Sequence, residues 1–292
     1  MSRGGVLVTG CATGIGEATA LRLAAAGFDV FAGVRRDEDG DRLAQRAATN
    51  LQPVILDVME ADSIAAARAQ MEDAVGPQGL AGLVNNAGGA VAGPLEFIAL
   101  DDLRWQLELN TIAQVGVSQA FLPLLRRAAN ARLVNIGSIG GRMATQFNGA
   151  YNASKFAMEA ISDAMRQELA PAGIHVVLIE PGSVATEIWR KGLDGLEAEL
   201  AKVPPEGRAI YEDRMREFAS AAAAIGARGI PPDRVAEVVE GALTARRPRT
   251  RYLVGPDARG QAAMARLLPD RAVDRVTGLF IKAMARQGRR LG

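Results

Sequence analysis

The residues from Val6 to Gly16, Val-Leu-Val-Thr-Gly-Cys-Ala-Thr-Gly-Ile-Gly, join a short β-branched run to a glycine-rich turn. The run predicts a buried strand, and the alanine-rich segment from Glu17 to Ala26 predicts the helix that follows it. Glycines at positions 10, 14 and 16 let the backbone turn tightly and approach a pyrophosphate at the N-terminus of that helix. No Lys-Ser or Lys-Thr pair follows them, so this is not a nucleoside triphosphate loop. We interpret the stretch as a dinucleotide-binding turn, with Cys11 as a small filler residue.

Beyond this stretch, short apolar runs alternate with alanine- and leucine-rich segments over the first 180 residues. Almost wholly apolar strands are expected when helices cover both faces of a parallel sheet, and the alternation is typical of βαβ units. We therefore predict an α/β fold with a doubly wound parallel sheet. The predicted strands are Gly5–Thr9, Asp29–Val34, Val54–Leu56, Gly82–Asn85, Arg132–Ile136 and His175–Ile179, and the predicted helices cover residues 15–26, 40–49, 60–75, 101–128 and 152–171.

From residue 186 to residue 229 the alternation gives way to a polar, helical segment that contains Pro204-Pro205. An insertion after the carboxyl end of a sheet strand is well placed to cover a ligand, so residues 186–229 are predicted to form a substrate lid. A helix over Pro232–Ala245 and a strand over Arg251–Val254 are expected after it. Because no repeat or low-complexity linker interrupts the chain, we predict one domain over residues 1–292, with residues 256–292 as a C-terminal helical extension.

The composition excludes several classes of protein. The 292 residues include 34 basic and 33 acidic side chains, and 49% are hydrophobic, as in an ordinary soluble protein with a core. A single cysteine and a single histidine, His175, exclude a disulfide framework and a cysteine- or histidine-rich metal site, so no metal is expected and His175 is interpreted as structural. The sequence has no apolar run of the ~18–20 residues that a transmembrane helix needs and no secretory signal, so a cytoplasmic location is expected.

Charge is unevenly distributed along the chain. Residues 262–292 carry seven basic and two acidic side chains, whereas the rest is mildly acidic, which argues against nucleic acid as a partner. Within this tail, Val273, Val276, Phe280 and Met284 recur near helical spacing. Such a helix could lie on an anionic membrane surface. We favour a helix packed on its own domain or on a partner subunit, with a solvated basic face.

The end of the second predicted strand, Phe31-Ala-Gly-Val-Arg-Arg, bears on the choice of cofactor. In NAD-binding folds an acidic residue about 20 positions after the glycines binds the ribose hydroxyls. Arg35 and Arg36 occupy this region, with Asp37 behind them. Because arginine binds a phosphate through charge-assisted hydrogen bonds, the pair favours NADP(H) over NAD(H), with a solvated charged turn as the alternative.

Tyr151 and Lys155 stand four residues apart in a predicted helix, which places a phenol and an ammonium on one face. A free phenol has a pKa near ~10, and a nearby cation lowers that pKa by stabilising the phenolate. The pair therefore predicts a general acid–base at Tyr151, with an ordinary surface pair as the alternative. Ser138, which follows the strand Arg132–Ile136, is placed to hydrogen-bond a substrate carbonyl.

Further motifs accompany these residues in a fixed order: Asp57-Val58, Asn85-Asn86-Ala87-Gly88, Asn110 and Pro181-Gly182-Ser-Val-Ala-Thr186. With the glycine turn, Ser138 and the Tyr151–Lys155 pair, they resemble the short-chain dehydrogenase/reductase superfamily from about Gly4 to Gly255. The resemblance implies a Rossmann-type sheet and the catalytic residues Asn110, Ser138, Tyr151 and Lys155. The implied cofactor-binding residues are Gly10, Thr13, Gly14, Ile15, Gly16, Arg35, Arg36, Asp57, Val58, Asn85, Ala87, Gly88, Tyr151, Lys155, Pro181, Gly182, Val184 and Thr186.

The resemblance also implies an activity, namely reversible hydride transfer between the nicotinamide and a carbonyl or alcohol carbon. By analogy, Tyr151 exchanges the substrate proton, Lys155 lowers the pKa of Tyr151 and binds the nicotinamide ribose, Ser138 orients the carbonyl, and Asn110 anchors a water. NADP-preferring members often have a basic residue at the position of Thr13, so the predicted preference for NADP(H) rests on Arg35 and Arg36.

The nature of the substrate is predicted from shorter segments. Residues 30–35, 251–257 and 267–271 are most similar to the hydroxysteroid and retinol dehydrogenase branch. Together with an apolar predicted lid, they favour a secondary alcohol or ketone with a bulky apolar, steroid- or retinoid-like body. The alternatives are a reductase of a small keto ester or hydroxy-acid type substrate, and a protein that senses the nucleotide without turnover. A homodimer or homotetramer is expected from the family. The apolar lid residues are Ile188, Trp189, Leu193, Leu196, Ile210 and Phe218.

Overall fold

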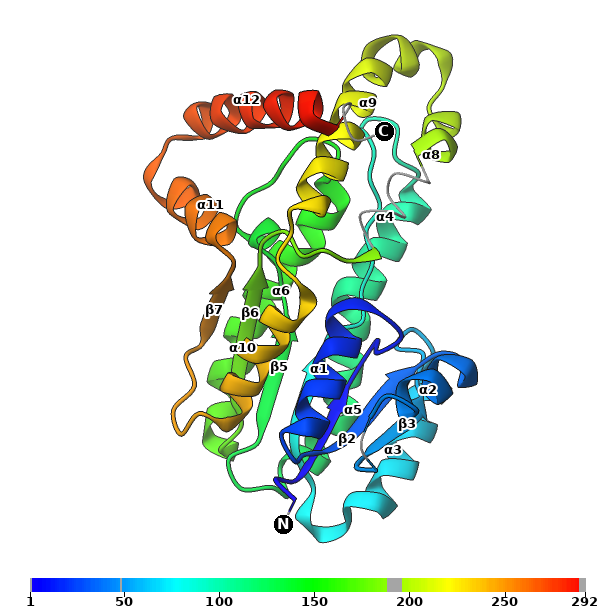
Figure 1. The fold of residues 1–292 in the computed structure, drawn as a ribbon, viewed down its shortest axis with the longest axis vertical. Helices are drawn as coiled ribbons and strands as arrows, with labels where there is room; N and C mark the ends of the chain where they lie inside the picture. Colours follow the sequence, from blue (N-terminus) through cyan, green and yellow to red (C-terminus); the bar gives the residue numbers. More distant parts are fainter. Residues whose placement is uncertain (1, 48, 188–195, 289–292) are drawn as a thin grey trace.

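A parallel sheet of seven strands forms the centre of the computed structural model, which describes residues 2–47, 49–187 and 196–288 (Figure 1). The strands lie in the order β3-β2-β1-β4-β5-β6-β7, and each pair of neighbours is parallel. This order confirms the predicted doubly wound, Rossmann-type α/β fold. The strands are β1 Gly5–Val8, β2 Asp29–Val34, β3 Leu51–Ile55, β4 Leu80–Asn85, β5 Arg132–Ile136, β6 His175–Pro181 and β7 Arg251–Val254.

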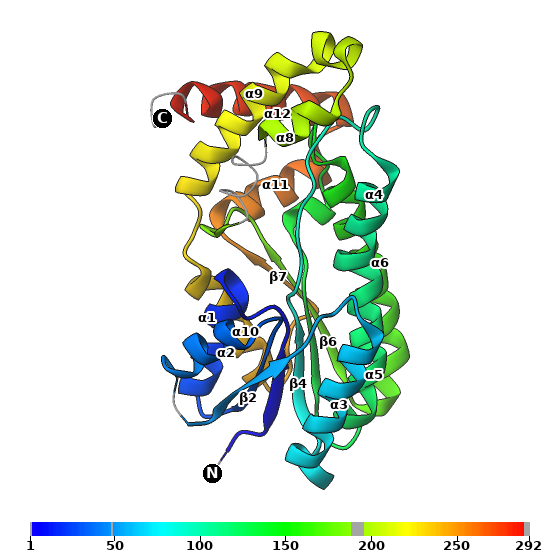
Figure 2. The same cartoon turned by 90° about the vertical axis from the view of Figure 1, so that its right-hand side faces the viewer.

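Helices cover both faces of the sheet (Figure 2). Successive residues of a strand point to opposite faces, so Val6 and Val8 pack in the layer under α1 and α10, whereas Leu7 packs in the layer under α3 and α5. Both layers are apolar, which explains why the strands read as continuous apolar runs. One face carries α1 Gly14–Ala25, α2 Asp37–Ala44 and α10 Pro232–Thr244, and the other carries α3 Ala61–Val75, α5 Ala113–Leu125 and α6 Gly149–Leu169.

The structure corrects the predicted bounds of two helices. The helix predicted over residues 40–49 is α2, and it begins at Asp37 because three acidic residues in its first turn are favourable at a helix N-terminus. The helix predicted over residues 101–128 is divided into three parts. These parts are α4 Leu100–Leu107, a π-helical turn over Glu108–Ile112, and α5.

The predicted lid and the C-terminal extension are helical. The lid segment contains α8 Leu196–Lys202 and α9 Pro205–Ala227, and the predicted lid residues Ile188, Trp189 and Leu193 lie outside the described residues. The extension contains α11 Pro256–Leu267 and α12 Asp270–Gly288, of which α12 packs along α9 at the end of the molecule remote from the N-terminus (Figures 1 and 2). Across the described ranges, no helix combines the length and the apolar character needed to cross a bilayer.

A substitution of Phe121 on α5 tests how much the core between the sheet and helices α3 and α5 contributes to stability. The side chain of Phe121 is 0% exposed in that layer. We expect Phe121→Ala to lower the free energy of unfolding by about 3–5 kcal/mol, since it removes buried apolar surface and leaves a cavity. Phe280→Ala is the matched control, because Phe280 is 51% exposed on α12, and a change of less than ~0.5 kcal/mol is expected. Urea unfolding followed by circular dichroism measures both, and equal losses would contradict this placement of Phe121.

Candidate active site

The loops that carry the predicted site residues meet at one edge of the sheet. Because the strands are parallel, the carboxyl ends of β1, β4, β5 and β6 lie together. The strand order reverses between β1 and β4, so the connections from these two strands run in opposite directions and leave a crevice between them. Residues 9–13, 86–89, 137–141 and 182–186, which follow these strands, are thereby gathered from distant parts of the chain.

The glycine turn after β1 is fixed against the loop after β4. Asn86 Nδ2 donates hydrogen bonds to the carbonyl oxygens of Thr9 and Gly10 at 2.8 and 3.2 Å, and the N–H groups of Asn86 and Ala87 both donate to Thr9 Oγ1 at 2.9 Å. Gly10 has a φ of +69°, and a Cβ there would lie 2.8 Å from the Cα of Ala87. A Cβ on Gly16 would clash with the carbonyl oxygen of Gly10. The turn therefore presents bare backbone at the N-terminus of α1, which fits the pyrophosphate of a dinucleotide.

The neighbours Asn85 and Asn86 have different roles. The side chain of Asn85, a predicted cofactor residue, is buried in the sheet, where Nδ2 donates to Asn135 Oδ1 at 3.0 Å and to Ser118 Oγ at 2.8 Å. That side chain joins β4 to β5 and α5. Asn86 was not among the predicted site residues. The alternation of side chains along a strand could have indicated it, because neighbouring side chains point to opposite faces of the sheet.

Arg35 and Arg36 follow β2 but have different surroundings. Arg36 pairs with acidic residues of α2, among them Asp39 at 2.9 Å. Arg42 on α2 also reaches Asp39, at 3.2 Å, and donates to the carbonyl oxygen of Ala12 in the glycine turn. Arg35 is exposed and forms no ion pair or hydrogen bond with any residue of the described ranges. Of the two predicted phosphate ligands, Arg35 is the one whose guanidinium is not already bound by carboxylates.

Asp57 and Val58 follow β3, beyond β2 at the outer edge of the sheet. Asp57 Oδ1 accepts a hydrogen bond from the N–H of Met59 at 3.0 Å, and Val58 is buried in the core. Parallel pairing of β3 with β2 places both residues at the same edge as Arg35. They stand on the β2 side of the glycine turn, apart from the loops after β5 and β6.

The loop after β6 approaches the glycine turn from the other side. A Cβ on Gly14 would lie 3.3 Å from Thr186 Cγ2, so these two predicted cofactor residues are neighbours. Asp257, at the start of α11, accepts a hydrogen bond from the N–H of Ser183 at 2.7 Å and holds this loop in place. Asp257 was not predicted as a site residue, although it ends the segment 251–257 singled out in the sequence, because it lies far from this loop along the chain.

Ser138, Tyr151 and Lys155 meet between the end of β5 and α6. Ser138 precedes a 3-10 turn, η3 (Ile139–Gly141); its Oγ accepts a hydrogen bond from the N–H of Gly140 at 3.0 Å, and its side chain is hydrogen-bonded to Tyr151. Lys155 is buried, and its Nζ donates to the carbonyl oxygen of Ile136 at 2.9 Å and lies 5.8 Å from the ring centroid of Tyr151. The structure thus brings three of the predicted catalytic residues together.

Burial governs the acid–base properties of this cluster. It raises the pKa of Tyr151 above that of a free phenol, and the hydrogen bond with Ser138 acts in the opposite direction. Burial also lowers the pKa of Lys155 to about 8, so its ammonium group is still mostly protonated at neutral pH. The sequence predicted that Lys155 lowers the pKa of Tyr151. In the structure Ser138 is the group that lowers it, and burial has the larger effect.

Asn110, the fourth predicted catalytic residue, lies in the π-helical turn between α4 and α5. Its buried side chain accepts a hydrogen bond from the N–H of Gly89 at 2.9 Å and donates to the carbonyl oxygen of Gly89 at 2.9 Å and to Ser154 Oγ at 3.1 Å. Such a turn interrupts the regular hydrogen bonding of a helix and is frequent at functional sites. Because Ser154 immediately precedes Lys155, Asn110 joins the loop after β4 to the catalytic part of α6.

An apolar cluster adjoins the catalytic side of α6. Phe147, in the loop that leads into α6, is buried in it, and its ring packs edge-to-face with that of Phe218 at 5.7 Å between centroids. The members on α8 and α9 come from the predicted lid; Leu196 and Phe218 pack as expected, whereas Ile210 is exposed. The cluster consists of Phe97, Phe147, Leu196, Leu200, Val203, Tyr211, Met215 and Phe218.

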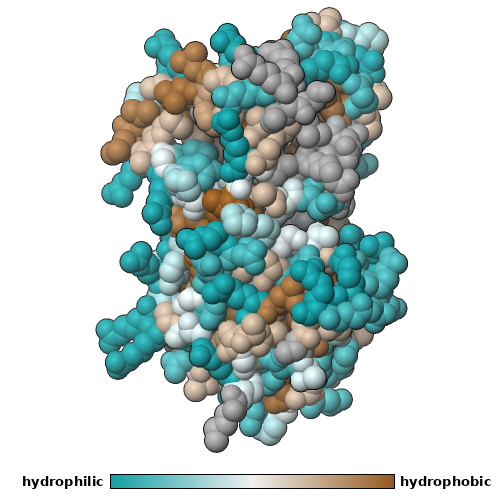
Figure 3. All heavy atoms as spheres, viewed as in Figure 1, coloured by the Kyte–Doolittle hydropathy of each residue, from teal (hydrophilic) through white to brown (hydrophobic). Residues whose placement is uncertain are grey.

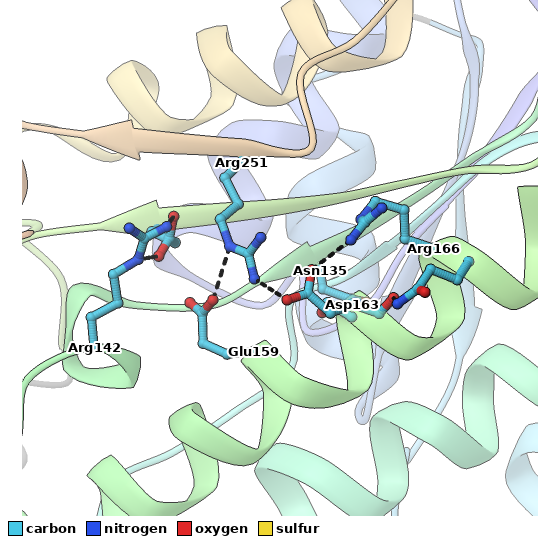
Figure 4. A network of polar contacts seen from close by, with 9 residues as sticks. Asn135, Arg142, Glu159, Asp163, Arg166 and Arg251 are labelled. Carbon is cyan, nitrogen blue, oxygen red and sulfur yellow. Dashed lines mark hydrogen bonds and ion pairs between the residues drawn. The ribbon is translucent and has the colours of Figure 1, made fainter.

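A network of carboxylates and arginines lies further along α6 (Figure 4). Arg251 of β7 contacts Glu159 at 3.0 Å and Asp163 at 2.7 Å, and Arg142, after η3, contacts the fully buried Glu180 of β6 at 2.7 Å. Burial, and next the hydrogen bond and the charge of Glu180, raise the pKa of Glu159 to about 7. Glu159 Oε1 has no hydrogen-bond partner in the described part of the chain.

Comparisons with known proteins agree with this geometry. A family model described as short chain dehydrogenase matches residues 5–196. Retinol dehydrogenase 5 of Mus musculus is 38% identical over 93% of this chain and 86% of its own length, and the NADPH-dependent 3-dehydrocapnine reductase of Ornithobacterium rhinotracheale is 33% identical over 96% and 98%. A crystal structure of a short-chain dehydrogenase from Streptomyces avermitilis superposes with a TM-score of 0.74 at 26% identity, over 90% of this chain and 92% of that one.

The raised pKa of Glu159 predicts a dependence of stability on pH. Since the pKa of Glu159 is raised to about 7 in the folded protein, the folded state binds a proton at this residue more tightly than the unfolded state, whose carboxyl has the ordinary pKa of ~4.3. The resulting stabilisation is complete below the unfolded pKa and is lost as the pH rises through 7.

Glu159→Gln is expected to remove this dependence, because a glutamine amide can donate to Glu180 at every pH. The Tm of the wild type should therefore fall more steeply than that of the variant as the pH is raised from about 5 to about 9. Differential scanning fluorimetry measures the Tm of both proteins at each pH. Groups that titrate in both proteins, such as His175, cancel when the two Tm curves are subtracted. Parallel curves would contradict the raised pKa of Glu159.

Proposed function

We propose that this chain, which belongs to the short-chain dehydrogenase family and is an oxidoreductase, transfers a hydride between NADP(H) and a secondary alcohol or ketone with a bulky apolar, steroid- or retinoid-like body. The family match and the retinol dehydrogenase relative confirm the predicted superfamily and branch. The observation that carries the proposal is the meeting of Ser138, Tyr151 and Lys155 at the crevice beside the glycine turn, next to the apolar cluster.

The chemistry follows from what each side chain can do. The cofactor supplies or accepts the hydride at nicotinamide C4. The Tyr151 hydroxyl gives a proton to the oxygen of a ketone, and in the reverse direction the Tyr151 phenolate takes one from an alcohol, while Ser138 holds that oxygen by a hydrogen bond. Lys155, whose Nζ lies 5.8 Å from the ring centroid of Tyr151, binds the nicotinamide ribose and so holds the cofactor beside the phenol. Because Lys155 is buried and Ser138 and Tyr151 are only partly exposed, these interactions are stronger than they would be at the surface.

The apolar cluster supports the choice of substrate. It places aromatic and aliphatic side chains of α8 and α9 against Phe147, four residues before Tyr151 in the chain, where the apolar body of a substrate would lie. The names of two relatives agree with this chemistry, because one is a retinol dehydrogenase and the other an NADPH-dependent reductase. Two alternatives remain open: a small keto ester or hydroxy acid as the substrate, and nucleotide binding without turnover. A substrate screen distinguishes both from the proposed activity.

The choice of cofactor rests on the end of β2. An exposed arginine without a carboxylate partner is suited to the 2′-phosphate of NADP(H), and Arg35 meets this description among the described residues. Arg36 is partly neutralised by Glu38 and Asp39. We therefore assign the preference for NADP(H) mainly to Arg35.

Two expectations stay predictions, namely a homodimer or homotetramer and a cytoplasmic location. Trp105, Ile112 and Phe156 are exposed on α4, the π-helical turn and α6. Their exposure supports association through this side of the molecule, since apolar side chains gathered on a surface favour contact with a partner.

Tyr151→Phe tests the reaction. The variant lacks the hydroxyl that exchanges the substrate proton, so kcat with a steroid, a retinoid or a small keto ester is expected to fall by at least about 10²-fold, while the Kd for NADPH stays within about twofold. Tyr252→Phe on β7 is the matched control and should keep full activity. NADPH oxidation followed by absorbance gives kcat, and an active Tyr151→Phe enzyme would overturn the mechanism.

Arg35→Ala tests the cofactor. Loss of a charge-assisted hydrogen bond, worth about 1.5–3 kcal/mol, is expected to weaken NADPH at least about tenfold and to leave NADH unchanged. The matched control, Arg36→Ala, should have a smaller effect, because Glu38 and Asp39 already hold that guanidinium. Titration of intrinsic fluorescence with both nucleotides gives the Kd values. Unchanged selectivity in Arg35→Ala would rule out this phosphate contact.

A further inference from the structure

Helix α12 has two apolar faces, of which only one is covered. Ile281 and Met284 are buried against α9. Val276, Leu279 and Phe280 lie on a different face and are 46%, 69% and 51% exposed. At about 3.6 residues per turn these three positions fall in one stripe along the helix. Packing on α9 therefore leaves an apolar stripe, Val276–Leu279–Phe280, in contact with solvent.

The apolar stripe continues beyond the start of α12. Leu267, the last residue of α11, and Leu268, in the connection from α11 to α12, are also exposed. In the space-filling view, hydrophobic residues gather at the upper left of the molecule, over α12 and this connection (Figure 3). An exposed apolar surface of this kind, with polar residues around it, marks an interaction site in a soluble domain.

A second stripe of α12 is basic and runs beside the apolar one. Its side chains are all exposed, and none of them forms an ion pair with another described residue. The acidic residues of the helix, Asp270 and Asp274, fall instead on the side that carries Ile281 and Met284. The basic stripe consists of Arg271, Arg275, Lys282 and Arg286.

We propose that α12 docks on the surface of an anionic phospholipid bilayer. The apolar stripe enters the boundary between the headgroups and the acyl chains, and the basic stripe lies against the lipid phosphates. Charge complementarity decides between this partner and a second copy of the chain. Antiparallel pairing of two apolar stripes would place the two basic stripes side by side, where like charges repel.

Docking in this way orients the protein on the bilayer. Helices α8, α9 and α12 lie at the same end of the molecule, remote from the N-terminus (Figures 1 and 2). The lid therefore faces the lipid, whereas the end of the sheet near the N-terminus points away from it. The surface site does not depend on which substrate the enzyme uses.

Co-sedimentation of the full-length protein with lipid vesicles tests the proposal. Binding is expected to vesicles of phosphatidylcholine mixed with phosphatidylglycerol, and not to phosphatidylcholine alone. It is expected to weaken as NaCl is raised, because salt screens the attraction between the basic stripe and the anionic surface.

Two variants of α12 are compared with matched changes elsewhere. Leu279→Ser and the double variant Arg275→Glu/Lys282→Glu are each expected to weaken vesicle binding by roughly tenfold or more. Leu100→Ser, at a leucine that is 63% exposed on α4, is the control for the first, and Arg126→Glu/Arg246→Glu, at two exposed arginines, is the control for the second. All four variants should keep the Tm and the NADPH affinity of the wild type, because they lie outside the core and the site.

Three outcomes would overturn the proposal. The first is a wild-type protein that does not bind the anionic vesicles, and the second is equal binding by the α12 variants and their controls. The third is a dimer, seen by size-exclusion chromatography with light scattering, that is lost in Leu279→Ser and kept in Leu100→Ser. That result would assign the apolar stripe to a second copy of the chain.

Discussion

The parallel pairing of β1 with β4 is the constraint on which the rest of the structure depends. It places the glycine turn and the loop after β4 side by side, with Thr9 and Asn86 bonded across the gap and no room for a side chain at Gly10. The same loop then continues to Gly89, whose backbone positions Asn110 and, through Ser154, the catalytic part of α6. The predicted cofactor turn and the predicted catalytic cluster are thus held in a fixed relation by one strand pair.

Burial acts on a single face of α6 at three successive turns. It raises the pKa of Tyr151, lowers that of Lys155 to about 8 and raises that of Glu159 to about 7, so each group is biased towards its neutral form. Each group interacts with a partner on the sheet side. Tyr151 interacts with Ser138, Lys155 with the carbonyl oxygen of Ile136, and Glu159 with Glu180. The protonation of this face therefore depends on how closely α6 packs on β5 and β6, and a shift of the helix would change all three groups together.

Features that depend on residues close in sequence could be predicted, and those that depend on distant packing could not. The glycine turn and the Tyr151–Lys155 spacing lie within single segments, and the apolar periodicity locates most strands. The π-helical turn at Asn110 was missed because the helical pattern continues through it. Arg35 and Arg36 look alike in the sequence, and only the start of α2, which brings Asp39 to Arg36, separates them. The sequence did not indicate the raised pKa of Glu159, because its partner Glu180 lies on another element, the strand β6.

Helix α9 connects the apolar cluster beside the predicted catalytic residues to helix α12. Met215 packs in the apolar cluster with Phe147, and Ala221 and Ala224, further along the same helix, pack against α12. Phe218 lies between them and contacts both groups of residues. The predicted lid and the C-terminal extension are therefore joined by two small apolar clusters, distinct from the two layers that cover the sheet. Because side chains of α9 belong to both clusters, α12 is coupled to the predicted lid through α9.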